Sequence, residues 1–357
     1  MHMSKVKKMP VQSGNNGRAA LVLASLAVLL AGCAVGPDYQ RPPAPTVLAL
    51  TRQALPNTQP ADISAQWWTA YGSPRINALV EQALRRNPNV EAGLANLKAA
   101  QEIVNAQRGL FYPAVQAGYS AARQNSGAVL QTPLNSGSTL FNLHTAQLNV
   151  GFVPDVWGGN RRQVESLQAS ADSQQYQLEA LRVTLASNVV AAAIAERFLS
   201  EQIGLAEQAI RVAAEQLQQL KSLKSAGYAS GMDLAQQQLS YVQTLALLPP
   251  LQKQIEQIRN LLAALCGQLP AEPLPGGGLD EIQTPAALPT ILPSSLVERR
   301  PDVQAAQAQL HASQAQIGVA AANLLPQLSL TASLAYNSNT LADLLSSAGK
   351  SWGLLGG

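Results

Sequence analysis

The longest regular pattern of apolar positions lies between residues 158 and 224. Every seventh residue from Val164 to Leu220 is apolar, whereas the companion positions three residues further on mix apolar and polar side chains. No proline interrupts this stretch. A strict sevenfold repeat is typical of helices that pack as coiled coils, so the pattern predicts one helix about 100 Å long, with one dry seam and one wetter face.

The residues that follow this helix predict a reversal of the chain. Gly227 can adopt the positive φ angle that ends many helices. Ser230 and Asp233 have the spacing of a capping box, which begins a returning helix. That helix must break or restart at Pro249-Pro250 before it ends near Leu265. The predicted tip of this helical hairpin consists of Ala226, Gly227, Tyr228, Ala229 and Ser230.

Three segments alternate apolar and polar residues with the period of a β-strand. The first begins at Val115 and the second covers about 141–153, so together they predict a hairpin with a long loop. The third, near Leu328–Tyr336, alternates over about ten residues, which is the length of a transmembrane strand with one lipid face and one wet face. An edge strand of a soluble sheet would show the same pattern and stays open as the alternative.

The chain also contains an internal repeat. Pro88-Asn89-Val90 matches Pro301-Asp302-Val303, and Pro113 matches Pro326 at the same offset of 213 residues. Helical patterning from about 74 to 84 and from 88 to 110 precedes the first strand, and 301–325 repeats the second of these helices. Chance similarity of alanine-rich helices is the alternative. Since the second copy has only 57 residues, we expect it to lack most of its return strand, its long helix and its tip, which leaves three strands in a truncated chain.

The basic character of the chain comes from its first residues. The formal net charge is +3, but residues 1–32 hold four basic residues and no acid, and without them 20 basic residues face 21 acidic ones. This balance removes the case for a nucleic-acid-binding face. The apolar run Ala19–Ala31 is too short for a membrane-spanning helix and follows the basic residues, as in a secretory signal peptide.

The signal ends at Leu30-Ala31-Gly32-Cys33, which resembles a bacterial lipobox. That resemblance predicts lipid attachment at Cys33 and, with alanine at position 34, sorting to the outer membrane. Two or three acyl chains give firm anchoring. An ordinary signal followed by a disulfide is the alternative. It is disfavoured because Cys266, in an apolar helical run, is typical of a small buried hydrophobe.

The sequence offers no pattern of catalytic or cofactor-binding chemistry. The three histidines are scattered without metal-ligand spacing, and Gly276-Gly277-Gly278 lies between prolines rather than between a strand and a helix. The nucleophile-elbow motif is missing from the sequence. We therefore expect no enzyme, no metal site and no cofactor apart from the covalent lipid on Cys33.

These patterns predict eight segments along the chain. They are a lipoprotein signal peptide (1–32), an acylated proline-rich tether (33–60), helices of the first repeat (61–110), a transmembrane β-hairpin (111–157), a long coiled-coil helical hairpin (158–270), a Pro/Gly linker (271–300), a helix of the second repeat (301–325), and one truncated β-strand of the second hairpin (326–357).

The combination resembles the outer-membrane factor family, the NodT-like and TolC-related lipoproteins of RND-type tripartite efflux pumps. The resemblance covers essentially the whole chain, with Ser73 and Cys266 as departures from the family pattern. Its motifs here are Cys33-Ala34-Val35-Gly36-Pro37-Asp38-Tyr39, Trp67-Trp68, Asn87-Pro88, Pro154-Asp155-Val156-Trp157-Gly158, Gly227-Tyr228-Ala229-Ser230 and Arg299-Arg300-Pro301-Asp302.

The resemblance implies an α+β membrane protein with long α-helical coiled-coil hairpins joined to transmembrane antiparallel β-strands. In the family, three copies form a twelve-stranded barrel in the outer membrane and a periplasmic α-barrel. By resemblance, the tip residues Ala226 to Ser230 contact a periplasmic adaptor (membrane-fusion) protein and, through it, an inner-membrane RND-type pump. A second tip and the gate of the family would lie beyond Gly357.

The expected function is therefore that of an outer-membrane channel subunit, a passive conduit for efflux, anchored by lipid in a Gram-negative bacterium and extending into the periplasm. A periplasmic coiled-coil adaptor is one alternative, although compact β-domains should then flank the helical hairpin. A structural lipoprotein is the other, and it would be favoured if the strands proved to belong to a soluble sheet.

Overall fold

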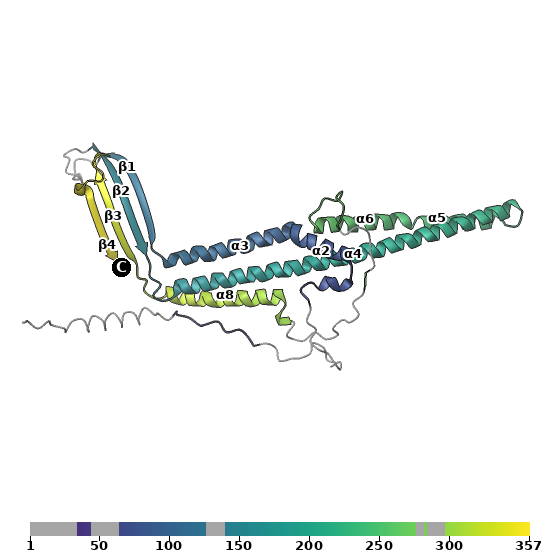
Figure 1. Ribbon diagram of the computed structural model, residues 1–357, viewed down its shortest axis with the longest axis horizontal. Helices are drawn as coiled ribbons and strands as arrows, with labels where there is room; N and C mark the ends of the chain where they lie inside the picture. The colour runs from purple at the N-terminus through teal and green to yellow at the C-terminus, as the bar shows by residue number, and fades with distance from the viewer. Residues whose placement is uncertain (1–33, 44–63, 126–139, 276–281, 284–296) are drawn as a thin grey trace, which may run out of the picture. The chain divides into compact units, whose positions relative to one another are not determined.

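The structure is a computed structural model that describes residues 34–43, 64–125, 140–275, 282–283 and 297–357 (Figure 1). The chain divides into two compact units. Unit 1 comprises residues 1–41, 100–171 and 308–357, and unit 2 comprises residues 42–99 and 172–307. The predicted signal peptide, Cys33, most of the predicted tether and most of the predicted linker lie outside the described residues.

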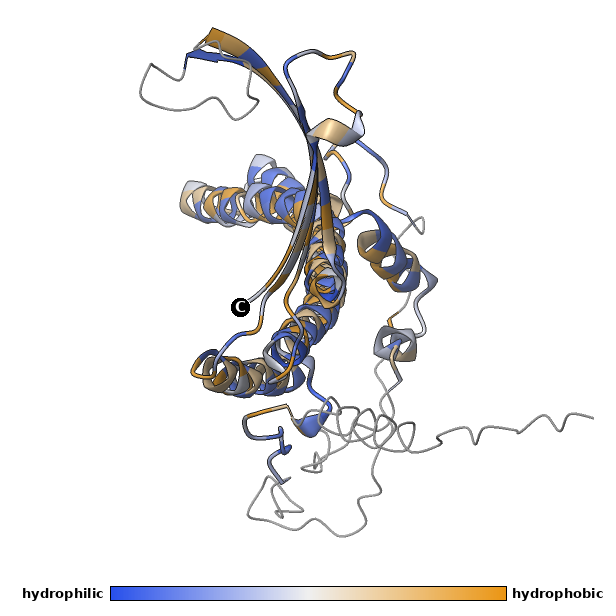
Figure 2. Cartoon of the chain, turned by 90° about the vertical axis from the view of Figure 1, so that its left-hand side faces the viewer, coloured by the Kyte–Doolittle hydropathy of each residue, from blue (hydrophilic) through white to orange (hydrophobic). Residues whose placement is uncertain are grey.

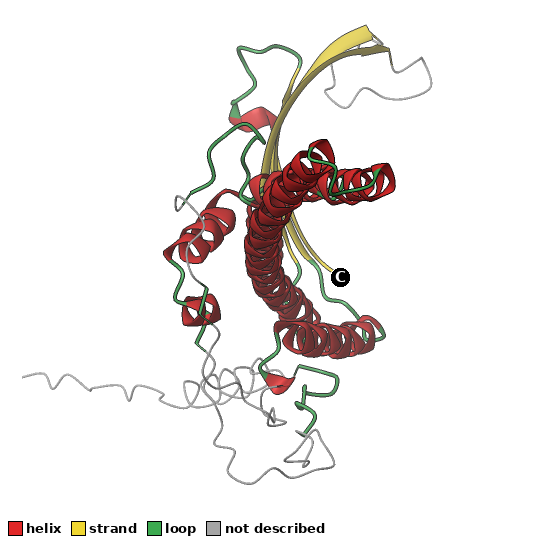
Figure 3. Ribbon diagram, turned by 90° about the vertical axis from the view of Figure 1, so that its right-hand side faces the viewer, coloured by secondary structure: helices red, strands yellow, loops and turns green. Residues whose placement is uncertain are grey.

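Unit 1 contains one four-stranded antiparallel sheet in the order β1-β2-β3-β4. Its strands are β1 (Ala114–Asn125), β2 (Leu140–Phe152), β3 (Leu330–Ser338) and β4 (Lys350–Gly356). Figure 3 shows these strands as a single curved sheet. The first hairpin pairs with the second through β2 and β3, where Leu148 lies opposite Leu334. The two halves of the sequence repeat therefore meet in one sheet.

The prediction of a single strand in 326–357 is wrong, because β4 follows β3 and pairs with it. Two glycines in this seven-residue strand and the adjacent pair Leu354-Leu355 interrupt the alternation that would have marked it in the sequence. The pairing with β3 fixes the register nonetheless, with Trp352 opposite Leu334. The chain contributes four described strands rather than three.

Three helices support the sheet in unit 1: α3 (Pro88–Arg108), α4 (Gly159–Ser225) and α8 (Pro301–Asn323), each of which continues into unit 2. The short 3₁₀ helix η2 (Gly109–Phe111) follows α3. Within unit 1, α4 and α8 approach closely, since the Ser166 hydroxyl donates to the Ala312 carbonyl at 3.0 Å. Alanines without bulky side chains permit that approach, and Ala169, Ala312 and Ala315 are buried.

Unit 2 is helical and is built around the predicted seam of α4. Its other elements are η1 (Trp67–Tyr71), α2 (Pro74–Arg86), α5 (Gly231–Leu245) and α6 (Leu248–Leu265). In the core, Leu79 of α2 and Leu262 of α6 pack with Leu185 and its neighbours on α4. None of the nine apolar positions at sevenfold spacing is exposed, which confirms the predicted seam. Figure 2 shows that hydrophobic and hydrophilic residues alternate along the helices and strands.

Ser73, one of the two departures from the family pattern, lies at the start of α2. Ser73 is the N-cap of α2, and its hydroxyl accepts a hydrogen bond from the Ile76 amide at 3.2 Å. Pro74 occupies the first turn, where its missing N–H costs nothing. Serine caps a helix about as well as aspartate does, so this position keeps its role with the shorter side chain.

A buried ion cluster joins three helices of unit 2. The Glu196 carboxylate of α4 is 2% exposed and accepts hydrogen bonds from the Arg75 guanidinium at 2.8 Å and from the Arg259 guanidinium at 3.1 Å. Arg75 belongs to α2 and Arg259 to α6. A buried carboxylate needs such partners because desolvation of an isolated charge costs several kcal/mol.

Candidate functional site

The sheet in unit 1 has two chemically different faces. On the first face, two successive rows across the strands are apolar: Val115, Val150, Ala332 and Leu354 form one row, and Ala117, Leu148, Leu334 and Trp352 form the next. Several of these side chains are exposed, with Trp352 at 72% and Leu354 at 75% of their full surface. An exposed apolar surface of this extent requires a hydrophobic environment, for which a lipid bilayer is suited.

The second face is polar in corresponding rows. Gln116, Asn149 and Ser333 lie opposite one another, and two rows further along the same face Ser120, Thr145 and Asn337 do so. The Thr145 hydroxyl donates to the Asn337 carboxamide oxygen at 2.8 Å. The side-chain amide of Gln147 donates to the Asn149 carboxamide oxygen at 2.7 Å. This is the pattern of a strand with one lipid face and one water face.

The sheet ends at β1 and β4, each of which pairs with one strand among the described residues. The outer edge of each strand therefore presents backbone N–H and C=O groups in need of hydrogen-bond partners. In hydrocarbon each unsatisfied group costs several kcal/mol, so a membrane-spanning sheet must close on itself or on other copies.

The predicted tip is a sharp turn that connects α4 to α5. Gly227 has a φ angle of +81°, and the Tyr228 amide donates to the Leu223 carbonyl at 2.9 Å while the Gly227 amide donates to the Lys224 carbonyl at 3.0 Å. This pair of hydrogen bonds is the Schellman motif, in which glycine is favoured at the left-handed position. Tyr228 is 83% exposed and presents its ring outward at the end of the hairpin.

The second half of the tip is the predicted capping box. The Asp233 amide donates to the Ser230 hydroxyl oxygen at 3.1 Å, and the Ser230 amide donates to the Asp233 carboxylate at 3.0 Å. The Ser230 hydroxyl also donates to this carboxylate at 2.7 Å, and these hydrogen bonds lower the pKa of Asp233. The turn is thus defined on both sides by backbone hydrogen bonds, although whether it contacts an adaptor stays a prediction.

A second site in unit 1 holds the segment Val35–Tyr39, which we call the docked segment. Arg162 of α4, with its side chain 7% exposed, donates to the Asp38 carboxylate at 2.6 Å and to the carbonyls of Val35 and Gly36 at 3.3 Å. The hydrogen bond to Asp38 is the main cause that raises the pKa of Arg162, so the guanidinium stays charged.

The helix α8 completes this site. His311 stacks on the Tyr39 ring at a centroid distance of 4.2 Å, and its Nε2 lies 2.8 Å from the Glu165 carboxylate. Burial would raise the pKa of Glu165, but hydrogen bonds from Arg162 and His311 outweigh it and lower the pKa. Sequence reasoning identified the docked segment as a motif but missed the site, because Arg162 and His311 follow no recognisable spacing.

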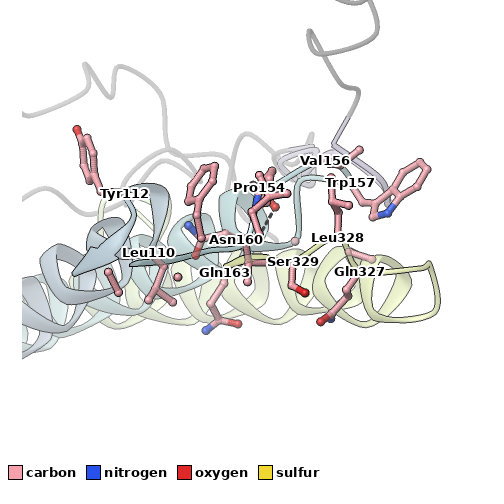
Figure 4. Close-up of a pocket in the computed structure, with 18 of the residues that line it drawn as sticks. Leu110, Tyr112, Pro154, Val156, Trp157, Asn160, Gln163, Gln327, Leu328 and Ser329 are labelled. Atoms are coloured by element: carbon pink, nitrogen blue, oxygen red, sulfur yellow. Dashed lines mark hydrogen bonds between the residues drawn. The ribbon is translucent and has the colours of Figure 1, made fainter. Parts of the chain in front are cut away.

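A groove, which we call the junction groove, lies where the helices of unit 1 meet its sheet (Figure 4). Its volume is about 580 Å³. Polar side chains such as Gln107 and Asn160 line one part of it, while most of the remainder is apolar. The principal apolar lining residues are Leu110, Tyr112, Phe152, Trp157, Leu328 and Leu330.

Of the two cysteines, only Cys266 lies within the described residues. Cys33, the predicted lipid-attachment residue, lies outside the described residues. Cys266 is a free thiol with no exposed surface, as predicted for a small buried hydrophobe, and it packs in the core of unit 2. Burial raises the pKa of Cys266 to about 11.

A family model described as outer membrane efflux protein matches residues 79–268 and 292–354. The chain belongs to this family. The match includes α4, the tip, β1 to β3 and most of β4, so both the two-faced sheet and the helical hairpin are features of this family. The predicted outer-membrane efflux function is confirmed, and neither the adaptor nor the structural-lipoprotein alternative is supported.

Curated relatives of this efflux protein are named as outer-membrane proteins of export or efflux. The pyoverdine export outer membrane protein OpmQ of Pseudomonas aeruginosa is 30% identical over 335 residues, which cover 90% of this chain and 69% of the relative. The toluene efflux pump outer membrane protein TtgF of Pseudomonas putida is 29% identical over 346 residues, covering 93% of this chain and 70% of the relative. The chain thus spans about two thirds of the length of the curated relatives it matches.

Solved structures agree with the family assignment. The outer-membrane channel OprN matches with a TM-score of 0.77 and 28% sequence identity, over 91% of this chain and 72% of that one. The Campylobacter jejuni CmeC outer membrane channel matches with the same TM-score at 21% identity, which supports the fold alone. The predicted fold class of long helices joined to antiparallel membrane strands is confirmed.

By length and composition alone, α4 of this efflux protein could also cross a membrane. Its apolar positions have a different explanation in unit 2, where Leu178, Leu185 and Val189 are buried in the core that α4 shares with α2, α3 and α6. The sheet rather than α4 therefore provides the surface that fits a bilayer.

Proposed function

We propose that this efflux protein is a subunit of a passive conduit through the outer membrane, formed by three copies. The observation that carries the proposal is the four-stranded sheet with one apolar and one polar face and with an outer edge at each end. Pairing β1 of one copy with β4 of the next closes the sheet, and three copies give the twelve strands of the family barrel. The apolar face then meets lipid and the polar face lines water.

The helical hairpin extends this conduit into the periplasm and contacts an adaptor through Ala226, Gly227, Tyr228, Ala229 and Ser230. A rigid turn with an exposed aromatic ring at its end is suited to such a contact, because aromatic side chains are enriched in protein interfaces. The name of the relative TtgF describes it as the outer-membrane protein of an efflux pump, which supports a pump as partner. The family resemblance implies that this pump, beyond the adaptor, is an inner-membrane pump of the RND type.

The lipid anchor belongs to the same proposal. Acylation of Cys33 would hold the amino-terminal end of the mature chain in the outer membrane of a Gram-negative bacterium, beside the sheet that spans it. Transport through the conduit needs neither catalysis nor a cofactor, because the pump supplies the driving force. The described residues contain no group of three or more potential metal-ligating side chains.

Two neighbouring residues of β2 test which face of the sheet meets lipid. Leu148 lies on the apolar face and Gln147 on the polar face, near the middle of the strand. Arginine on a lipid face costs about 2–4 kcal/mol at the bilayer midplane. We therefore expect Leu148→Arg to reduce the amount of heat-modifiable trimer in outer-membrane fractions strongly, and Gln147→Arg to assemble. Equal assembly of the two variants, or greater damage from Gln147→Arg, would contradict the proposal.

The adaptor contact needs a separate experiment. A photoreactive amino acid at Tyr228 should cross-link to the adaptor in intact cells, whereas the same group at Leu205, which is exposed on α4 far from the tip in sequence, should not. Identification of the cross-linked partner by mass spectrometry decides the result. Cross-links to the adaptor from Leu205 but not from Tyr228 would place the contact elsewhere.

A further inference from the structure

The first described residues of the chain lie directly against the wall of the junction groove. The Val35 amide donates to the Trp157 carbonyl at 3.1 Å, and Ala34 packs so closely on Gly158 that a Cβ added to this glycine would lie 2.6 Å from the Ala34 Cα. Trp157 and Gly159, on either side of Gly158, both line the groove. Residue 33 is bonded to Ala34, so any group attached to it begins one residue from the groove.

This end of the chain is fixed in place by the docked segment. Arg162 binds Asp38 and two backbone carbonyls of the segment, and Tyr39 stacks on His311. Gly36 has a φ angle of +97°, and a Cβ added to it would lie 2.5 Å from the Gly318 Cα, so the segment lies in backbone contact with α8. Contacts on both α4 and α8 therefore hold the docked segment, which follows directly on Ala34.

The groove itself has the chemistry of a site for a hydrocarbon chain. Leu110, Tyr112 and Leu328 line it and remain partly exposed, at 61%, 74% and 45% of their full surface. Its volume falls within the usual range of ligand pockets, about 300–1,000 Å³. Aromatic side chains such as Tyr112 and Trp157 are favoured at membrane interfaces, where their apolar rings meet acyl chains.

We propose that the junction groove binds an acyl chain of the lipid carried by Cys33. This inference rests on the proposed lipid anchor and adds a site for it. A chain attached one residue away has a far higher effective concentration at the groove than a phospholipid that diffuses in the bilayer, which favours this occupant over a free lipid. Each methylene that enters the groove covers apolar side chains of the groove that would otherwise contact water.

A photoreactive fatty acid tests the site in the intact protein. Cells that incorporate a diazirine-bearing fatty acid into their lipoproteins are irradiated, and the chain is purified from the outer membrane, digested and analysed by mass spectrometry. We expect a cross-link between the lipid on the Cys33 peptide and peptides that contain Trp157 or Leu328. Leu328→Gln should lower that yield several-fold without changing acylation, whereas the matched Leu324→Gln, which lies outside the groove and is 86% exposed, should not.

The other outcomes are distinguishable. An acylated Cys33 whose lipid cross-links only to phospholipids or to other parts of the chain overturns the groove proposal and leaves the anchor intact. Equal labelling of the groove in a Cys33→Ser variant exported with an ordinary cleavable signal assigns the groove to free lipid and also overturns it. A Cys33 without any fatty acid overturns the lipid anchor of the proposed function, and the groove proposal with it. Heat-modifiable migration of each variant shows that it has folded.

Discussion

The tip provides a sharp test because one substitution should have opposite effects at two glycines of the same hairpin. Gly227 has a φ angle of +81°, and a Cβ added there would meet no atom within 4 Å. A Cβ added to Gly204 in α4 would likewise meet no atom within 4 Å, but the φ angle of Gly204 is not in the left-handed region. Steric clash is therefore absent at both sites, and only the backbone conformation differs.

The magnitudes follow from that difference. An alanine in the left-handed region costs roughly 1–2 kcal/mol, of which the lower entropy of its unfolded chain recovers about 0.4–1 kcal/mol. Gly227→Ala should therefore lower the free energy of opening of the tip by about 1 kcal/mol. Gly204→Ala should raise the free energy of local opening by about 0.8–1 kcal/mol, because alanine is the better helix former.

Hydrogen exchange measured by mass spectrometry on the assembled protein reports both values. Amides of 222–235 should exchange about fivefold faster in Gly227→Ala, and amides around Gly204 about fourfold slower in Gly204→Ala, since 1.4 kcal/mol corresponds to a factor of ten. Gly227→Val should be worse than Gly227→Ala and should reduce adaptor cross-linking more than Ala226→Ser does. Unchanged or slower exchange at the tip of Gly227→Ala would refute the assigned requirement for a left-handed residue.

Three further predictions concern charged and titratable groups. The lowered pKa of Asp233 contributes stability that is fully present above the ordinary value of 3.8 and is lost as the pH falls through the lower folded value; the protection of the tip amides, taken relative to their intrinsic exchange rate at each pH, should therefore fall in acid, and Asp233→Asn should remove that dependence. Glu196→Ala should cost about 3–5 kcal/mol in exchange protection of α4, because it removes the carboxylate that pairs with the buried Arg75 guanidinium, whereas truncation of the half-exposed Arg259 should cost less than about 1 kcal/mol. With its pKa near 11 and no exposed surface, Cys266 should resist maleimide at pH 8 in the folded protein and react after unfolding; rapid labelling of the native chain would contradict its burial.

The features predicted correctly from the sequence are those that local or periodic residue patterns determine. The seam from Val164 to Leu220 is visible at a fixed spacing, and each residue contributes to it independently of what packs there. The turn at Gly227 and the box of Ser230 with Asp233 need only neighbouring residues. Such elements are specified by backbone geometry and short-range hydrogen bonds, so their position follows from the residue types alone.

The features that escaped prediction depend on partners distant in the sequence. Arg162 is separated from Asp38 by 124 residues, and His311 from Glu165 by 146, and no spacing rule connects them. The Trp157 indole likewise donates to the Pro326 carbonyl at 2.7 Å across 169 residues, which ties the first hairpin to the start of the second. The residue type of an arginine or a tryptophan indicates which hydrogen bonds it can donate. It does not indicate which distant acceptor the fold will place beside it.

The strand β4 was missed for a third reason, which is that its formation depends on pairing with other strands. Its own residues carry a weak alternation, and β3 supplies the register that makes it a strand. The outer edge of β4 must in turn be satisfied by a strand that the described residues of one chain do not supply, and the same holds for β1. Alternation in a sequence therefore determines which face of a strand is apolar but not which strand will pair with it. In the proposed trimer, the complementary edges of identical chains supply these partners, so the hydrogen bonds of the edge strands β1 and β4 are satisfied only in the closed assembly and not in any single copy.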